Sequence, residues 1–167
     1  MTQYVNNADN LHEQKVLEFV ASCWKCKHVQ SLEKKASFDG FLYRYEDMGF
    51  ENYDRPKALV EVRRLNCPSA QHNTAMISYT KVQNWQSLFP VLNIPCYFVV
   101  NWFDKLGFAD IADIAAYGDI RVSPFSKNRR NPENDREIVF HYPVIKFKTL
   151  GTLSDAKKLH AIGKVND

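Results

Sequence analysis

The sequence contains no uninterrupted run of the roughly 18 apolar residues that a membrane-spanning helix needs. Its first ten residues, MTQYVNNADN, are mostly polar and lack the apolar stretch of a secretion signal. We therefore expect a cytoplasmic protein without a membrane-embedded segment.

Cysteines are few: the chain has four, at Cys23, Cys26, Cys67 and Cys96. Without an export signal, they are expected to be reduced thiols rather than disulfides. The spacing of Cys23 and Cys26, with His28 close behind, is also that of half a zinc site. Because this segment has a helical pattern, in which residues i and i+3 merely share a face, we favour ordinary thiols.

Several catalytic motifs are missing as well. The chain has no Gly-x-Ser-x-Gly turn, no glycine-rich phosphate loop and no His-Glu-x-x-His, and its five histidines form no cluster in the sequence. These absences argue against acyl transfer, nucleotide hydrolysis by a P-loop, zinc proteolysis and a histidine-based metal nuclease.

What the chain does contain is enough apolar material for one compact core. It has 167 residues, of which 45% are hydrophobic and 13% aromatic, so it should fold as a single domain that buries about two thirds of its unfolded surface. The net charge of +3 is only mildly basic. Three cations are nevertheless concentrated at Lys127, Arg129 and Arg130, between two strand-like segments.

The pattern of apolar residues predicts an α/β protein with a mixed central sheet flanked by helices. Asn10 is a candidate N-cap for the first helix, with Glu13 placed for a capping box. The strand at 96–100 is apolar on both faces, as in the centre of a sheet. Predicted helices cover residues 11–28, 69–89, 109–117 and 154–163, and predicted strands cover residues 36–45, 57–65, 96–100, 119–123 and 137–148.

A carboxylate and a cation interrupt the apolar strand at 57–65. Side chains alternate along a strand, so Glu61 and Arg63 share one face while Val60 and Val62 point into a core on the other. The preceding strand carries Asp39. Two carboxylates and a cation at this spacing are the parts of a magnesium site for hydrolysis.

The order of Asp39, an insert and Glu61-Val62-Arg63 on a core strand resembles the PD-(D/E)XK nuclease superfamily, also called the restriction-endonuclease-like fold. The predicted elements from residue 11 to residue 104 follow that superfamily's core order, short of one strand that cannot be separated from the 45–57 insert.

The resemblance implies a Mg²⁺- or Mn²⁺-dependent endonuclease that hydrolyses phosphodiester bonds. DNA is the expected substrate, with RNA left open, and a homodimer is the simpler expectation for cutting both strands. Asp39 and Glu61 would be the metal ligands, together with the main-chain carbonyl of Val62.

Arg63 takes the position that a lysine usually holds in this superfamily. A guanidinium remains protonated, so Arg63 is expected to clamp a phosphate rather than accept a proton. Lys81, on the apolar stripe of the predicted second helix, is a candidate to replace the missing lysine, or else it extends from the edge of that stripe into water. Glu13 either caps the first helix or faces the site.

Each assignment has an alternative. Asp39 precedes Gly40 and could simply form a turn, and Glu61 and Arg63 could be ion-pair partners on a solvated sheet face. The basic segment 126–131 is either a phosphate-contacting loop or a solvated hairpin tip. The chain could be a nuclease-fold protein that binds nucleic acid or a protein partner without cutting, or an interaction module that uses its acidic segment 46–54.

Overall fold

The structure, a computed structural model, describes residues 7–31, 38–44, 56–123 and 137–164. Four α-helices and nine strands are found in these ranges. The helices are α1 (Asn7–Cys23), α2 (Tyr79–Leu92), α3 (Ile111–Tyr117) and α4 (Leu153–Ala161). The strands are β1 (Cys26–Gln30), β2 (Gly40–Arg44), β3 (Ala58–Arg64), β4 (Thr74–Ser78), β5 (Cys96–Asn101), β6 (Leu106–Asp110), β7 (Asp119–Val122), β8 (Ile138–Pro143) and β9 (Lys148–Thr149).

The central element is a six-stranded mixed sheet in the order β1-β2-β3-β5-β6-β9. β3 and β5 are parallel neighbours in its middle, and the other pairs are antiparallel. Both middle strands are rich in valine and are buried along most of their length, as expected for strands covered on both faces.

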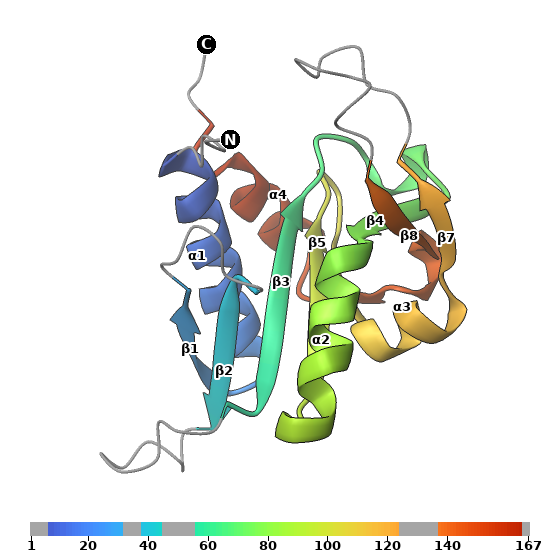
Figure 1. The fold of residues 1–167 in the computed structure, drawn as a ribbon. Helices are drawn as coiled ribbons and strands as arrows, with labels where there is room; N and C mark the ends of the chain where they lie inside the picture. Colours follow the sequence, from blue (N-terminus) through green and yellow to red (C-terminus); the bar gives the residue numbers. More distant parts are fainter. Residues whose placement is uncertain (1–6, 32–37, 45–55, 124–136, 165–167) are drawn as a thin grey trace.

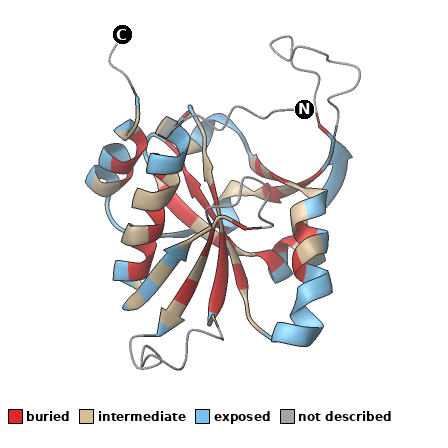
Figure 2. Ribbon diagram, turned by 60° about the vertical axis from the view of Figure 1, so that its left-hand side comes forward, coloured by how far each residue is buried: buried red, intermediate tan, exposed pale blue. Residues whose placement is uncertain are grey.

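Helices cover both faces of this sheet (Figure 1). On one face, α1 and α4 pack with the even-numbered valines of β3 in a cluster that includes Val16, Leu17, Val60, Val62 and Leu159. On the other face, α2, α3 and the small sheet form a second cluster around Val82, Trp85, Phe98, Ile114 and Phe140. Figure 2 shows the buried residues concentrated along the central strands between these layers.

A second, three-stranded antiparallel sheet has the order β4-β8-β7. Its inner face contributes Ala75, Ile77, Phe140 and Tyr142 to the second cluster. The sequence places β4 between β3 and α2, so this sheet is an addition to the αβββαβ core that α1, β1, β2, β3, α2 and β5 form.

The first helix is shorter than predicted at its C-terminal end. It stops at Cys23, Lys25 takes a positive φ of 52°, and residues 26–30 form β1. β1 is the core strand that is missing from the predicted order, and it lies before Asp39 rather than in the 45–57 insert. Exposed and half-buried side chains alternate along β1, which is the pattern of an edge strand. The predicted helix at 11–28 included these residues, so this pattern was missed. Asn10 lies inside α1, so its assignment as an N-cap is wrong.

The predicted helix at 69–89 is also wrong in its first half. Residues 69–71 form one 3-10 turn and residues 74–78 form β4, so Met76 and Ile77 belong to a strand and only the part from Tyr79 onward is helical. The segment TAMIS alternates in burial, a period-2 pattern that is too short to separate from a helical one in the sequence. Asn93 ends α2 in the left-handed conformation, with φ of 50°.

Two smaller differences concern the C-terminal half. The strand predicted at 137–148 divides into β8, a 3-10 turn at 144–146 and the two-residue β9. β6 was not predicted. None of the helices in the described ranges is long and apolar enough to cross a membrane.

Candidate functional site

The candidate site lies at the N-terminal end of β2, where β3 extends beyond its pairing with β2. β2 pairs with β3 only from Gly40, opposite Val60, and β3 runs on to Arg64. Asp39 sits at this fork. Its main-chain N–H donates to Val60 O at 3.0 Å, and its own carbonyl accepts from Ser31 N at 2.8 Å, so the residue is fixed on both sides.

Where the main-chain hydrogen bonds between β2 and β3 stop, the Asp39 carboxylate accepts the next hydrogen bond from β3. Val62 is the next residue whose main chain points toward the β2 side, and its N–H donates to Asp39 Oδ2 at 2.7 Å. A strand residue directs its N–H and C=O to the same side, so the Val62 carbonyl opens into the same fork. Asp39 is therefore not a simple turn residue, because its carboxyl group accepts the last hydrogen bond at the end of the β2–β3 pairing.

Glu61 reaches the same place from β3. Its side chain is 14% exposed and accepts a hydrogen bond from Lys81 Nζ at 2.8 Å, and the nearby charge of Asp39 acts on its carboxyl group. The solvated ion pair between Glu61 and Arg63 that the sequence allowed is wrong, because the cation beside Glu61 comes from α2.

Burial makes this cluster electrostatically unusual. Burial first, and then the neighbouring charge of Asp39, raise the pKa of Glu61 to about 8, against the attraction of Lys81. Burial also raises the pKa of Asp39, although the Val62 N–H and Lys81 oppose the change. Two carboxyl groups held together out of water favour a bound proton or a cation between them.

Lys81 remains the charged partner of this pair. Burial lowers the pKa of Lys81, but the attraction of Glu61, Asp39 and Glu13 outweighs burial, so the net direction is upward. Its side chain is 26% exposed and belongs to the first turn of α2. The alternative in which Lys81 extends away from the apolar stripe into water does not fit this arrangement.

Glu13 faces the cluster from α1. Burial, followed by the charges of Asp39 and Asp9, raises the pKa of Glu13 to about 7. Its position in the second turn of α1 excludes the capping-box role, which required a helix start at Asn10. A third carboxyl group, with a raised pKa, thus lies within electrostatic range of Asp39.

Arg63 binds the small sheet, and Lys81 is the cation that binds Glu61. Its Nη1 donates to the main-chain oxygen of Met76 on β4 at 3.0 Å. Arg63 therefore ties the small sheet to β3 next to the site. The structure brings together Asp39, Glu61, Lys81 and the Val62 main chain, with Glu13 near them, and joins Arg63 to β4.

The donor set fits a hard divalent cation. Two half-buried carboxyl groups and a main-chain carbonyl are oxygen ligands of the kind that Mg²⁺ prefers, and Mg²⁺ commonly keeps several waters. Within the described ranges, no three His, Cys, Asp or Glu side chains gather closely enough to hold a metal by themselves. The pair Asp39 and Glu61 is thus the core of a site that water would complete.

A buried polar contact that the sequence did not reveal supports α1 beside the site. His12, the residue before Glu13, is 2% exposed, and its Nε2 donates to Asn101 Oδ1 at 2.9 Å. Asn101 Nδ2 in turn donates to the main-chain oxygens of Trp102 and Ala156. The only signal in the sequence is a polar residue directly after the apolar run of β5.

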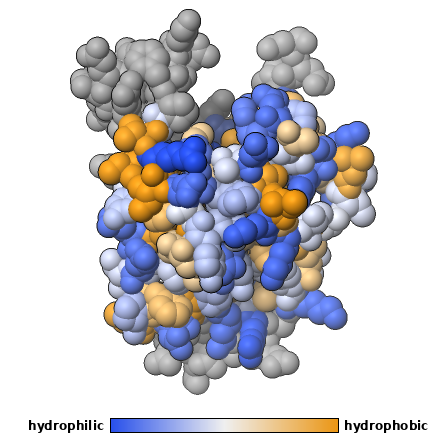
Figure 3. Space-filling view, turned by 90° about the vertical axis from the view of Figure 1, so that its right-hand side faces the viewer, coloured by the Kyte–Doolittle hydropathy of each residue, from blue (hydrophilic) through white to orange (hydrophobic). Residues whose placement is uncertain are grey.

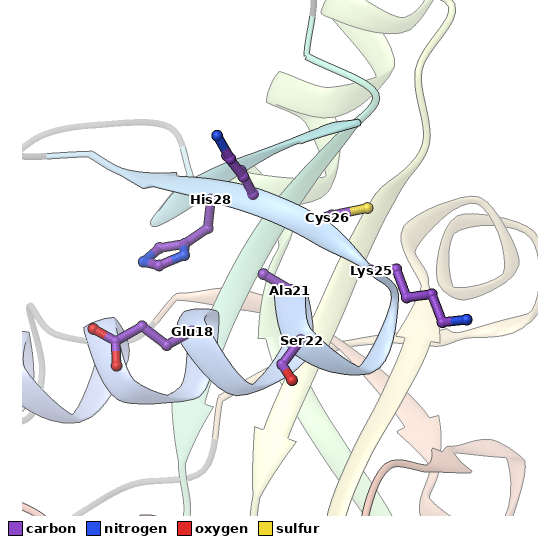
Figure 4. Close-up of a pocket in the computed structure, with 7 residues that line it drawn as sticks. Glu18, Ala21, Ser22, Lys25, Cys26 and His28 are labelled. Carbon is purple, nitrogen blue, oxygen red and sulfur yellow. The ribbon is translucent and has the colours of Figure 1, made fainter. Parts of the chain in front are cut away.

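A separate open cavity lies between the second half of α1 and β1 (Figure 4). The side chains of Glu18 and His28 point toward one another across it. Its lining residues are Glu18, Ala21, Ser22, Lys25, Cys26, Lys27 and His28, none of which belongs to the Asp39 cluster. Cys23 ends α1 and Cys26 begins β1, so the two thiols do not share a helix face and the zinc alternative has no support in the described ranges.

Two predicted surfaces lie outside the described residues. These are the basic segment with Lys127, Arg129 and Arg130, and the acidic segment 46–54.

Comparison with known proteins agrees with the geometry. A solved structure described as a nuclease from a fusselovirus superposes with a TM-score of 0.53 over 95% of each chain, at 15% sequence identity. That likeness shows the fold alone. No curated protein sequence is significantly similar to the chain.

The model of one protein family matches residues 1–150, a range that contains Glu13, Asp39, Glu61 and Lys81. The resemblance to the PD-(D/E)XK superfamily is therefore confirmed: the chain belongs to the family described as "phage putative PDDEXK endonuclease".

Proposed function

We propose that the protein is a magnesium-dependent endonuclease that hydrolyses phosphodiester bonds of DNA. The observation that carries this proposal is the gathering of the half-buried Asp39 and Glu61 carboxyl groups beside Lys81, at the fork of β2 and β3. A chain gains nothing in stability by holding two carboxyl groups together out of water, so their arrangement is better explained by a ligand of opposite charge.

Asp39, Glu61 and the Val62 carbonyl would hold the metal. When bound, the ion supplies a water of lowered pKa and positive charge for the phosphate oxygens. Mn²⁺, with the same preference for oxygen ligands, is expected to substitute for Mg²⁺.

Lys81 is the residue of this chain that we assign to the reaction itself. Its ammonium is already held at the carboxylate pair and is charged at neutral pH, so it can orient the attacking water and stabilise charge that develops on the phosphate. In this proposal the cation of the site is Lys81 on α2, and Arg63 on β3 does not take that role. Glu13, with a pKa of about 7, is suited to exchange a proton or to hold a water at the edge of the site.

The first prediction tests the metal ligands. Asp39→Asn and Glu61→Gln should each reduce Mg²⁺-dependent cleavage of plasmid DNA by more than about 100-fold, because each replaces a charged ligand by a neutral one of the same shape. Glu18→Gln, on the same helix as Glu13 but bound to Lys15, is the matched control and should cleave normally. Substantial cleavage by a folded Asp39 or Glu61 variant would exclude this site, and an inactive wild type would favour a binding protein with a nuclease fold.

The second prediction concerns pH and metal binding without turnover. Glu61 and Glu13 have pKa values in the folded protein, of about 8 and about 7, above those of the unfolded chain. The unfolded state therefore releases their protons first, and the metal-free protein should lose stability as pH rises from about 4.5 to about 8. Millimolar Mg²⁺ should raise the melting temperature more at pH 8 than at pH 5, because protons compete with the metal at the lower pH.

Scanning calorimetry or fluorescence melting at the two pH values measures this difference. Glu61→Gln should melt at a higher temperature than the wild type in metal-free buffer at pH 8 and should respond little to Mg²⁺. An equal response of wild type and variant would show that the metal binds elsewhere.

The third prediction separates the two cations. Lys81→Ala should abolish turnover while leaving the affinity for DNA within a few-fold of the wild type, because its charge acts at the reacting phosphate. Gln83→Ala, two residues along the exposed side of α2, is the control and should keep activity. Arg63→Ala should mainly lower the melting temperature, since it loses the bond to Met76. A selective loss of turnover in Arg63→Ala, with Lys81→Ala active, would reverse the two roles.

The fourth prediction addresses the expected DNA-binding segment. If Lys127, Arg129 and Arg130 bind phosphates, replacing all three by glutamine should weaken binding to every sequence alike. The slope of log affinity against log salt should fall by about one for each phosphate that is no longer neutralised. Binding is measured in the Glu61→Gln background without metal, so that cutting does not interfere. A variant that neutralises the exposed lysines Lys148, Lys157 and Lys158 is the control. Unchanged affinity and slope in the first variant would place the DNA elsewhere.

A further inference from the structure

The small sheet ends in β7, an edge strand whose four residues are all exposed. Among the described strands, β7 pairs only with β8, so its other edge presents unpaired main-chain groups. Apolar side chains gather here: Ile120 is 57% exposed, Val122 is 58% exposed, and Ile138, opposite Val122 on β8, is 49% exposed. Figure 3 looks onto this side of the molecule and shows hydrophobic side chains on its surface.

The hydrogen bonds of the β7–β8 pair define which groups point outward. Ser123 N–H donates to Glu137 O at 2.7 Å, so the main chain of Ser123 faces β8. This direction alternates along a strand. Asp119 and Arg121 therefore also face β8, and the N–H and C=O groups of Ile120 and Val122 point to the open edge.

We propose that this open edge pairs with the same edge of a second copy of the chain, antiparallel about a two-fold axis at Ile120. A two-fold contact uses the same surface of both copies, so that surface must be complementary to itself. The sequence Asp119-Ile120-Arg121-Val122 meets this requirement in one register.

Charge selects the register. With Ile120 opposite Ile120 of the second copy, Asp119 lies opposite Arg121 and Arg121 lies opposite Asp119, which gives two pairs of opposite charge. An axis at Arg121 would place the two arginines opposite one another, which destabilises a sheet. An axis at Val122 would set Arg121 against Ser123, so both pairs of opposite charge would be lost.

The main-chain groups also match in the register centred on Ile120. The two Ile120 residues exchange a pair of hydrogen bonds, as directly opposed residues with outward-facing groups do. Val122 lies opposite Gly118, whose backbone is extended and whose N–H is already bound to Ile114 O at 2.8 Å. The Gly118 carbonyl can accept the bond that Val122 N–H donates, whereas the Val122 carbonyl receives no bond from Gly118, because that N–H is used within its own copy.

The apolar side chains of the two copies would cover each other. Ile120 lies opposite Phe140 and Val122 opposite Ile138 on β8, so all of them project from the face of the small sheet that contributes Phe140 to the core. Pairing at Ile120 joins the two exposed patches into one, which removes apolar surface from water in both copies.

Charged side chains on an edge strand usually discourage pairing. Here the two charges have opposite signs and are two residues apart, and within one copy Arg121 Nη2 already binds Asp119 Oδ2 at 2.9 Å. The same pair that neutralises the edge in a single copy can be exchanged between two copies without leaving a charge unpaired.

The test is the self-association of the purified protein without DNA, measured by sedimentation velocity across the micromolar range. The wild type should show a concentration-dependent dimer. Arg121→Asp turns both opposite-charge pairs into like-charge pairs and should weaken the dimer by about ten-fold or more. The double variant Asp119→Arg/Arg121→Asp restores complementarity and should restore the dimer. Lys157→Asp, an equal charge change on the exposed side of α4, is the control and should dimerise like the wild type.

Ile120→Pro provides a second measurement. Because the Ile120 N–H points away from β8, proline removes a bond to the second copy and none of the β7–β8 ladder, so a monomer with an unchanged circular dichroism spectrum is expected. A wild type that stays monomeric, an Arg121→Asp variant that dimerises as strongly as the wild type, or a folded double variant that does not recover would each overturn this interface. None of these outcomes depends on cleavage activity, so the proposed function is tested independently.

Discussion

The hydrogen bond from Val62 N–H to the Asp39 carboxylate is the interaction on which the site depends. It stands where β2 stops pairing with β3, and it replaces a ladder bond by a bond to a charged side chain. The main chain of Asp39 is tied to Val60 and Ser31, so its carboxylate has little freedom to leave. This constraint holds a negative charge beside Glu61 and opens the Val62 carbonyl into the same space. A sheet that paired along its whole length would have no room for a ligand here.

Side chains from the central sheet and from the helices on both of its faces lie near the point where β2 and β3 separate. β3 supplies Glu61, α2 supplies Lys81 from its first turn, and α1 directs Glu13 toward the fork, with the neighbouring His12 anchored to Asn101. The two apolar clusters on either side of the sheet fix these elements relative to one another. Metal-free, the arrangement costs stability, because Glu61 and Glu13 have raised pKa values for reasons that begin with burial. Sites that are built for a ligand commonly carry such a cost.

The sequence predicted the sheet core and the pair Asp39 and Glu61 because those signals are local. Alternation along β3 separates Glu61 and Arg63 from Val60 and Val62 without any knowledge of the neighbours. The prediction failed at β1, β4 and β6, where five-residue strands adjoin helices and a period of two cannot be told from a period of 3.6 over so few residues. Those errors moved Cys26, His28 and Met76 from strands to helices, although the predicted class, a mixed central sheet flanked by helices, is confirmed.

By itself, then, the sequence determined the fold class, the superfamily and the place of Glu61 on a core strand with Asp39 before it in the chain, since periodicity and residue order carry this information. Only the tertiary structure decided which cation serves them. Arg63 and Lys81 are equally plausible along the chain, but Arg63 is bound to Met76 O and Lys81 Nζ lies 2.8 Å from Glu61. It also showed that Glu13 lies in the second turn of α1, within electrostatic range of Asp39, and does not cap the helix. Arg63 and Met76 are 13 positions apart and Glu61 and Lys81 are 20 positions apart. Such contacts depend on how layers pack, and no local pattern in the sequence records that.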